Sequence, residues 1–233
     1  MRPKTGADAF RRSVAGLGEA LCALGKHGPE AHEIRRDDAI GAKVAWAVDN
    51  HWIDAAVVPV GAAPPADDAS LPHCLWIVSG QRAENRRELT DIAMPAMSLD
   101  LADLQDRDGT AEEVSLGDIG GVNDRAYGGT QLGSLIGALP PTIGRAYAVR
   151  EPGGRLVSVA AAIDIGTDVS VQWVATDPAH RRQGLGTRVM RALLSEARRR
   201  GRRTASLQAS PDGLPLYQRL GFRTVGHLHA HVR

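Results

Sequence analysis

Short runs in the C-terminal half of the chain alternate between apolar and polar residues, and this period of two predicts β-strands. These runs are residues 145–151, 156–165, 168–176 and 204–210, with Gly221-Phe222 opening a last one. Other segments carry apolar residues at every third or fourth position, which predicts helices. These segments are residues 116–126, 131–139, 183–200 and 213–220. The pattern predicts an α/β (α+β) fold with a mixed, mostly antiparallel central sheet flanked by helices.

The N-terminal part of the chain predicts a separate, smaller α/β lobe. Helical spacing covers residues 10–24 and 39–57, and the second segment has Val44, Val48 and Trp52 on one face. The elements expected next are a strand over 73–78, a helix over 83–92 and a strand over 95–101. The polar stretch 105–109 is typical of a linker, so we predict two domains, residues 1–108 and 109–233.

The stretch Ala179-His-Arg-Arg-Gln-Gly-Leu-Gly-Thr187 joins the predicted strand 168–176 to the predicted helix 183–200. Two arginines and two glycines destabilise the start of a helix, because cations interact unfavourably with the positive end of the helix dipole and glycine is a weak helix former. A bound anion removes both objections. Free backbone N–H groups, a close approach allowed by the glycines and two guanidinium groups would together hold a pyrophosphate.

Two common phosphate-binding loops do not fit this stretch. A P-loop needs Lys and then Ser or Thr directly after its second glycine, whereas Gly186 is followed by Thr187 and Arg188. A Rossmann fingerprint places its first glycine straight after the strand and adds a third. The pattern Arg181-x-x-Gly184-x-Gly186 instead resembles the acetyl-CoA loop of the GNAT acyltransferases. Their second motif is similar to the segment that runs from Tyr217 to Leu220-Gly-Phe222.

The resemblance covers the C-terminal half of the chain and implies the acyl-CoA N-acyltransferase fold, with acetyl-CoA as co-substrate. It implies that the backbone of 174–176 pairs with pantetheine and faces the thioester carbonyl. The alternative is that these backbone groups only form the hydrogen bonds of the sheet. At Ser210 many relatives carry an asparagine that holds the cofactor. The implied cofactor-binding residues are Val174, Ala175, Thr176, Arg181, Arg182, Gln183, Gly184, Leu185, Gly186, Thr187 and Ser210. The expected strand, helix and strand over 73–101 also resemble part of a GNAT lobe, so residues 1–108 are interpreted as a degenerate companion.

Acyl transfer to an amine benefits from a group that protonates the departing thiolate. Tyr217 suits this role because the ordinary tyrosine pKa of about 10 lies near that of an alkyl thiol. By resemblance Tyr217 matches the general acid of the family. The alternative is a tyrosine that fills the core beside Leu216 and Leu220.

A general base is harder to find in the sequence. Many relatives have a glutamate where this chain has Gln172, and an amide cannot accept a proton at physiological pH. Asp164 could line a cleft, but an aspartate just before Gly166 more often ends a strand at a turn. We therefore expect a proton path relayed by water. The stretch 123–127 either shapes acceptor specificity or caps its helix.

The composition of the chain indicates which classes of partner and cofactor to expect. The net charge of +1 with 24% charged residues gives no overall basic field that would indicate nucleic acid or membrane. The start of the chain lacks the apolar run of a signal peptide, and no stretch is long enough to span a bilayer, so a cytoplasmic protein is expected. Cys22 and Cys74 are expected as reduced core residues. The alternating histidines 227, 229 and 231 lie too linearly to close a tetrahedron, so no metal is expected.

We therefore predict an N-acetyltransferase that transfers an acetyl group from acetyl-CoA to a primary amine by direct attack. The acceptor is a small molecule or a peptide, and the chain forms either a monomer or a homodimer. The alternative is a non-catalytic acyl-CoA-binding sensor, which the absent carboxylate at Gln172 favours. A nucleic-acid binder based on the arginines of 198–203 ranks third, because helix-end charge compensation explains half of them.

Overall fold

The computed structural model describes residues 6–47, 50–105, 109–129 and 131–233. The chain divides into two compact units. Unit 1 contains Met1–Ser98, Ser206–Leu214 and Arg223–Arg233, and unit 2 contains Leu99–Ala205 and Pro215–Phe222. Each unit thus joins segments that are far apart in the sequence. The predicted division after residue 108 stays a prediction, and residues 106–108 lie outside the described part of the chain.

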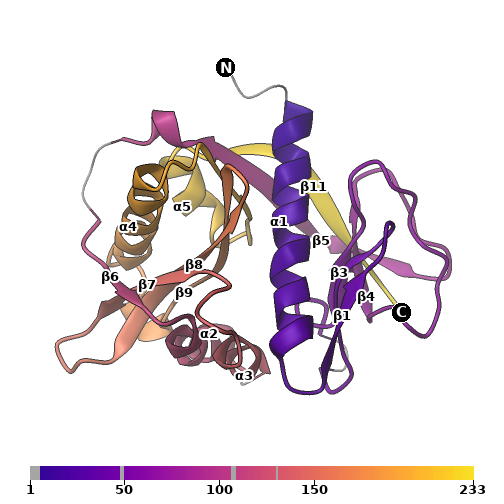
Figure 1. The fold of residues 1–233 in the computed structure, drawn as a ribbon, viewed down its shortest axis with the longest axis horizontal. Coiled ribbons are helices and arrows are strands. Elements are labelled where there is room, and N and C mark those ends of the chain that lie inside the picture. The colour runs from indigo at the N-terminus through magenta and orange to yellow at the C-terminus, as the bar shows by residue number, and fades with distance from the viewer. Residues whose placement is uncertain (1–5, 48–49, 106–108, 130) are drawn as a thin grey trace. The chain divides into compact units, whose positions relative to one another are not determined.

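Unit 1 is a sheet with one long helix, α1 (Gly6–His27), against its first strands. Its strands are β1 (Ala31–Arg35), β2 (Ile40–Val44), β3 (Ala55–Val57), β4 (Cys74–Val78), β5 (Arg87–Asp100) and β11 (Arg223–Val232). They lie in the order β1-β2-β3-β4-β11-β5, with β3 and β4 parallel and the other neighbours antiparallel. The C-terminal strand β11 therefore completes the sheet of the N-terminal residues (Figure 1).

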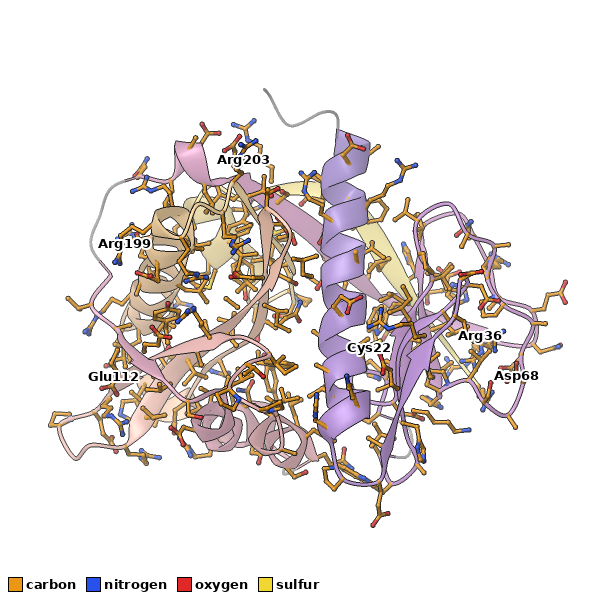
Figure 2. All side chains as sticks on the ribbon, viewed as in Figure 1. Cys22, Arg36, Asp68, Glu112, Arg199 and Arg203 are labelled. Carbon is orange, nitrogen blue, oxygen red and sulfur yellow. The ribbon has the colours of Figure 1, made fainter. Side chains whose placement is uncertain are left out.

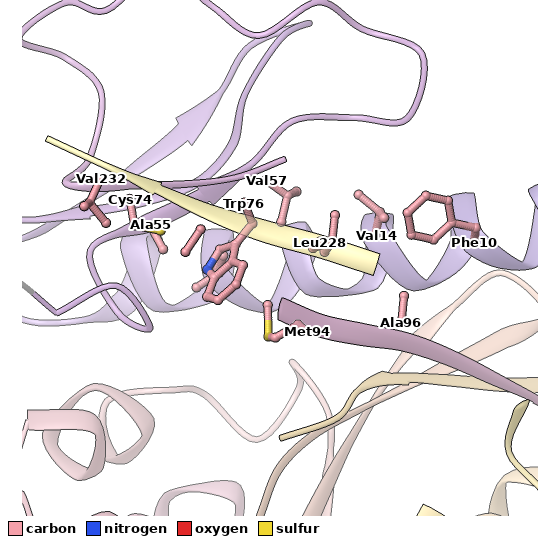
Figure 3. Close-up of a cluster of buried hydrophobic side chains, with 12 residues drawn as sticks. Phe10, Val14, Ala55, Val57, Cys74, Trp76, Met94, Ala96, Leu228 and Val232 are labelled. Atoms are coloured by element: carbon pink, nitrogen blue, oxygen red, sulfur yellow. The ribbon is translucent and has the colours of Figure 1, made fainter. Parts of the chain in front are cut away.

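The core of unit 1 lies between α1 and these strands. Phe10 and Val14 of α1 pack with Trp76 of β4, Met94 of β5 and Leu228 of β11 (Figure 3). Burial of such side chains contributes about 1.5–3 kcal/mol each, so this cluster is a major source of stability for the unit. Both cysteines, Cys22 and Cys74, are free and buried, as the sequence predicts.

The helix predicted over 39–57 is wrong, because Ile40–Val44 form β2 and Ala55–Val57 form β3. Gly41 pairs with Ala56, and a Cβ at Gly41 would lie only 2.3 Å from the carbonyl oxygen of Ala55. The buried carboxylate of Asp54 accepts hydrogen bonds from the backbone N–H groups of Val44 and His73, each at 2.9 Å. The close approach of the β2 and β3 backbones and the hydrogen bonds of Asp54 therefore favour strands, although the spacing of apolar residues is helical. Val48, part of that predicted face, lies outside the described residues.

The helix predicted over 83–92 is also wrong, since β5 begins at Arg87 and runs for 14 residues. Its first residues pair with the end of the chain, where His231 lies opposite Glu88 and Val232 opposite Arg87. The side chain of Arg86 is fully buried and donates to Asp67 at 2.7 Å and to the carbonyl of Pro72 at 2.9 Å. Partners this distant along the chain leave no local periodic signal.

Unit 2 has an antiparallel sheet in the order β9-β8-β7-β6. The strands are β6 (Glu112–Val114), β7 (Arg145–Arg150), β8 (Leu156–Ile165) and β9 (Asp168–Thr176), and β10 (Thr204–Gln208) is divided between the units. The helices are α2 (Gly120–Tyr127), α3 (Gln131–Gly137), α4 (Leu185–Arg199) and α5 (Leu214–Arg219), with 3-10 turns η1 (Leu101–Asp103), η2 (Leu116–Ile119) and η3 (Pro178–His180).

Helices cover both faces of this sheet. Figure 1 shows α4 on one side of β7, β8 and β9, and α2 with α3 on the other. Val189, Leu193 and Ala197 of α4 are fully buried, and Gly201 ends the helix with a φ of +81°. The predicted mixed, mostly antiparallel sheet flanked by helices is thus confirmed, and the strands predicted over 156–165 and 168–176 have the bounds that the sequence indicates.

Candidate active site

Strand β9 carries a bulge near its C-terminal end. Val159 of β8 lies opposite Ala175, whereas Ala161 lies opposite Gln172, so two steps on β8 span three on β9. Trp173, within this extra step, has a φ of +50°, which is unusual for a bulky residue. A bulge interrupts the hydrogen-bond ladder and leaves backbone groups of the extra residue unpaired. The ladder between β8 and β9 is therefore interrupted at Trp173 and Val174.

The chain then turns through η3 into the start of α4. Asp177 begins the turn, and its carboxylate accepts a hydrogen bond from the N–H of Ala179 at 3.1 Å. Arg182 and Gly184 follow in the left-handed region, with φ of +65° and +76°. Gly184 is the N-cap of α4 and gives it no side-chain cap. The N–H groups of the first turn are thus directed at solvent or a ligand, which is the local geometry that binds phosphate at helix starts.

The two loop arginines have different surroundings. Arg181 donates from Nε to the carbonyl of Thr176 at 3.3 Å and from a terminal nitrogen to the carbonyl of Ala126 at 2.9 Å. Arg182 is exposed, and its guanidinium makes no ion pair or hydrogen bond within the described residues. Arg181 thus fastens the loop to the end of α2, while the charge of Arg182 is available to an anion.

The other loop residues place the start of α4 against the end of β9. Leu185 is buried, while Gln183 is exposed and Thr187 is half-buried. A Cβ on Gly186 would lie 3.6 Å from Oγ1 of Thr176 and 3.4 Å from Leu216 of α5. The hydroxyl of Thr176 lies 2.9 Å from that of Ser158, and Ala175 is buried. These are ordinary van der Waals distances, so the helix, the strand and α5 meet at Gly186 without requiring glycine there.

Three side chains of helix α2 contact the end of β9, the turn that follows it and the start of β8. Tyr127 donates its hydroxyl to the carbonyl of Val174 at 3.0 Å. The side-chain amide of Asn123 donates to the carbonyl of Ile119 at 3.1 Å and, in a longer contact of 3.5 Å, to the carbonyl of Trp173. Arg125 pairs with Asp177 at 2.8 Å and also donates to the carbonyl of Leu156 at 2.8 Å. The bulge and the turn that follows are thus held from one helix.

Asp177 is the charged centre of this turn. Its carboxylate, almost fully buried, also pairs with Arg155 at 3.2 Å. The hydrogen bond from Arg125 lowers the pKa of Asp177, against the effect of burial. His180 of the same turn lies 3.1 Å from a carboxylate oxygen of Glu151. Asp177 therefore stays ionised and paired, and it acts as an anchor of the loop rather than a base.

Tyr217 lies on α5 with its side chain buried. Its ring meets that of Phe222 edge to face, with centroids 6.0 Å apart. Burial raises the pKa of the Tyr217 hydroxyl well above its usual value, and the nearby Tyr127 adds to the effect. The hydroxyl is thus a proton-bearing donor at neutral pH. Ser210, also named by the resemblance, belongs to unit 1, where its hydroxyl accepts a hydrogen bond from the N–H of Gly213 at 3.2 Å.

Three side chains of unit 2 bear on the choice of a general base, and each of them has a hydrogen-bond or ion-pair partner. Asp164 pairs with Arg200 at 3.1 Å and with Arg202 at 3.4 Å, which agrees with its interpretation as a strand-end residue. Asp124 accepts a hydrogen bond from the N–H of Gly133 at 2.8 Å. Gln172 is buried and donates to the hydroxyl of Ser170 at 2.9 Å. None of these three places a free carboxylate at the bulge.

The arginine-rich end of α4 is largely occupied by internal contacts. Besides the pairs with Asp164, Arg199 meets Glu196 at 2.6 Å, at the outer side of the helix in Figure 2. Arg198 donates to the carbonyl of Leu104 at 3.2 Å. Among the described residues, no group of three or more His, Cys, Asp or Glu side chains is placed to hold a metal, and no helix is long and apolar enough to cross a membrane.

Sequence reasoning found the loop but missed the bulge at Trp173 and the anchor at Asp177. The pair Asp177-Pro178 carried a usable signal, because aspartate before proline is typical of the start of a helical turn. A bulge after a β-branched run has no comparable signature. The contacts of Asn123 and Tyr127 with β9 join residues about 50 positions apart, which no local pattern indicates.

Comparisons with known proteins agree with this geometry. Residues 144–224 match the family model of the acetyltransferase (GNAT) domain. A GCN5-related N-acetyltransferase from Kribbella flavida has a similar fold, with a TM-score of 0.60 and 19% identity over 94% of this chain and 95% of that one. A GNAT-family structure from Novosphingobium aromaticivorans gives a TM-score of 0.57 and 18% identity over 96% of each chain. No curated protein matches the sequence. The bulged strand and the loop that follows it both lie within the segment that matches the GNAT acetyltransferase domain, and the fold is that of the two GNAT structures.

Proposed function

We propose that the chain is an N-acetyltransferase that transfers an acetyl group from acetyl-CoA to a primary amine by direct attack, with Tyr217 as general acid. The observation that carries the proposal is the bulge at Trp173–Val174, followed by an uncapped start of α4 and by the guanidinium of Arg182, which has no partner among the described residues. The bulge and the uncapped start of α4 thus lie at the two ends of one strand-to-helix turn. A CoA thioester carries complementary groups, a pyrophosphate and an acyl carbonyl.

The residues of the loop fit the pyrophosphate. Arg182 offers a charge-assisted hydrogen bond, and the N–H groups from Gly184 to Thr187 lie at the positive end of α4. The backbone of Val174, Ala175 and Thr176 would accompany the pantetheine arm. A bulge N–H that points at the thioester carbonyl would stabilise the charge that this oxygen gains as the amine attacks.

Tyr217 would donate a proton to the departing sulfur. Its raised pKa keeps the hydroxyl protonated throughout the physiological pH range, so a proton is always available for transfer. The same shift makes it a weak acid, but a thiolate that forms in a buried site is also destabilised by poor solvation. Proton transfer and sulfur departure are therefore favoured together.

Deprotonation of the acceptor is the step for which the described residues offer no evident base. Gln172 is an amide, and Asp124, Asp164 and Asp177 are held by partners. A lysine-like amine with a pKa of about 10.4 is more than 99% protonated at neutral pH. We therefore propose that water carries this proton away, so turnover should rise with pH until the acceptor itself is deprotonated.

The second candidate is an acyl-CoA-binding sensor without turnover. The observation that favours it is the Gln172–Ser170 hydrogen bond, because it places a neutral, satisfied pair on the strand where a base would act. Both candidates bind the same co-substrate through the same loop. Only release of CoA separates them.

The test is thiol release from acetyl-CoA in the presence of a panel of amines, which covers small amines, aminoglycosides, peptide N-termini and lysine peptides. An enzyme releases CoA in proportion to acetylated product for at least one acceptor, and mass spectrometry locates the acetyl group. Binding of acetyl-CoA with no release above background would support the sensor. Absence of binding would contradict both candidates.

A further inference from the structure

Asn123 and Tyr127 hold two consecutive carbonyls of the β9 bulge from the same helix. Tyr127 donates to Val174 at 3.0 Å, and Asn123 reaches Trp173 at 3.5 Å. These two carbonyls belong to the two peptide units that form the bulge. Sheet pairing normally fixes such groups, but a bulge interrupts it. Contacts from α2 therefore replace the missing ladder.

Neither side chain is required to complete α2 itself. The helix ends at Gly128, whose φ of +72° and hydrogen bond to the carbonyl of Asp124 at 2.9 Å form the C-cap. The side chain of Tyr127 is largely exposed, with 64% of the residue accessible, so it adds little core packing. Asn123 is fully buried, and its Oδ1 makes no hydrogen bond within the described residues. A buried acceptor without a partner is costly, and an apolar side chain would avoid that cost.

Planarity of the peptide bond connects these contacts to catalysis. In a trans peptide the C=O of one residue and the N–H of the next lie in one plane and point in opposite directions. Holding the carbonyl of Trp173 toward α2 therefore turns the N–H of Val174 away from α2. Holding the carbonyl of Val174 fixes the next peptide unit, whose N–H belongs to Ala175, the residue opposite Val159 of β8.

We infer that Asn123 and Tyr127 are positioning residues for acyl transfer, which fix the direction of the bulge N–H groups toward the thioester carbonyl. They touch neither the acetyl group nor the amine, and they act through the backbone of Trp173 and Val174. The inference rests on the proposed function, because it assigns these residues to recognition of the carbonyl of the same co-substrate.

The test compares two stable analogues of acetyl-CoA that differ only in the carbonyl. In the first, CH2 replaces the thioester sulfur and the carbonyl stays in place; in the second, CH2 replaces the carbonyl as well. The ratio of their dissociation constants measures recognition of the carbonyl, without need of an identified acceptor. Calorimetry is run on the wild type, Tyr127→Phe and Asn123→Leu. Tyr147→Phe is the matched control, because Tyr147 is buried in the same unit on β7, which pairs with β6 and β8 rather than with β9.

We expect the wild type and Tyr147→Phe to prefer the ketone about three- to tenfold, the usual worth of one hydrogen bond. Tyr127→Phe and Asn123→Leu should bring the ratio toward one and leave affinity for the deoxo analogue unchanged. A merely structural role would weaken both analogues together. The exposed ring of Tyr127 makes its Phe variant safe for folding, so it decides the matter even if Asn123→Leu unfolds.

The outcomes also separate this inference from the proposed function. Variants that keep the wild-type ratio overturn the positioning role and leave the co-substrate assignment intact. If the wild type binds both analogues equally, the bulge does not recognise the carbonyl, and this result also overturns the positioning role. A wild type that binds neither analogue overturns the proposed function and this inference together.

Discussion

At Tyr217 a single hydroxyl separates a catalytic role from a packing role. Tyr217→Phe keeps the ring and its edge-to-face contact with Phe222. If the hydroxyl protonates the departing thiolate, kcat should fall about 10²-fold while affinity for acetyl-CoA stays near wild type. The check is to measure kcat and melting temperature on the same preparation. A folded variant with full kcat would remove Tyr217 from the mechanism, and a lower melting temperature with unchanged kcat would assign it to the core.

Arg181 and Arg182 are neighbours in sequence, but their contacts predict that their alanine variants lose different properties, affinity for acetyl-CoA or thermal stability. Arg182→Ala should weaken acetyl-CoA binding about 10-fold or more with an unchanged melting temperature, because a hydrogen bond to a charged group contributes about 1.5–3 kcal/mol. Arg181→Ala should lower the melting temperature as well, because it removes contacts with the carbonyls of Thr176 and Ala126. Calorimetry and thermal unfolding on both variants provide the measurement. Loss of affinity confined to Arg181→Ala, without loss of stability, would reverse the two roles.

Among the elements, those of unit 2 were the most predictable from sequence. Strands β8 and β9 and helix α4 have clean periods, and each packs against elements close by in the chain. The helices predicted over 39–57 and 83–92 are wrong because pairing between strands decides both structures. Gly41 approaches the backbone of β3, and β5 pairs with the C-terminal strand, and neither pairing appears in a helical period.

The candidate site also has parts that the sequence indicates and parts that it does not. The sequence singled out the loop 181–187 because arginines and glycines at a helix start contradict helix propensity, and binding of a ligand there stays a prediction. The bulge was not predictable, because the extra residue on β9 exists only relative to its partner β8. Asn123, Tyr127 and Arg125 could be placed on a helix from sequence, but their targets on the strand came only from the tertiary packing.

Strand β11 carries a histidine that should make the stability of the protein sensitive to acid. His231 is buried, and its two ring nitrogens make no hydrogen bond within the described residues. Burial lowers its pKa; Glu88 opposes this, whereas His229, Arg82 and Arg86 reinforce it. The folded state therefore binds this proton only at a lower pH than the unfolded chain, whose histidine pKa is about 6.5.

It follows that the free energy of unfolding should fall as the pH drops below about 6.5, by at most about 1.4 kcal/mol per pH unit for this proton, until the folded pKa is reached. Denaturant unfolding between pH 7.5 and 5 measures the slope. His231→Leu should flatten it, with a remainder from His51, whose pKa burial also lowers. A slope that is the same in the variant would show that His231 does not cause the sensitivity.

At the scale of the whole molecule, two units of mixed architecture share one chain, and only unit 2 carries the loop chemistry. Within the described residues, no strand of unit 1 leads into a loop with arginine and two glycines at the start of a helix. Its long helix α1 comes before all of its strands. An anion site of the kind seen at α4 is therefore not built in unit 1. We predict that each chain binds one acetyl-CoA.

Gly184 provides a sharp test of that stoichiometry. A Cβ at this position meets no atom within 4 Å, and aspartate and asparagine tolerate its left-handed φ of +76° better than other side chains. Gly184→Asp puts a negative charge where the pyrophosphate would bind and should abolish binding, while the neutral, equally sized Gly184→Asn should keep most of it. Calorimetry should give one site for the wild type and the Asn variant. Binding near wild-type affinity in a folded Gly184→Asp protein would mean that acetyl-CoA is held elsewhere, and two sites in the wild type would show that unit 1 binds it too.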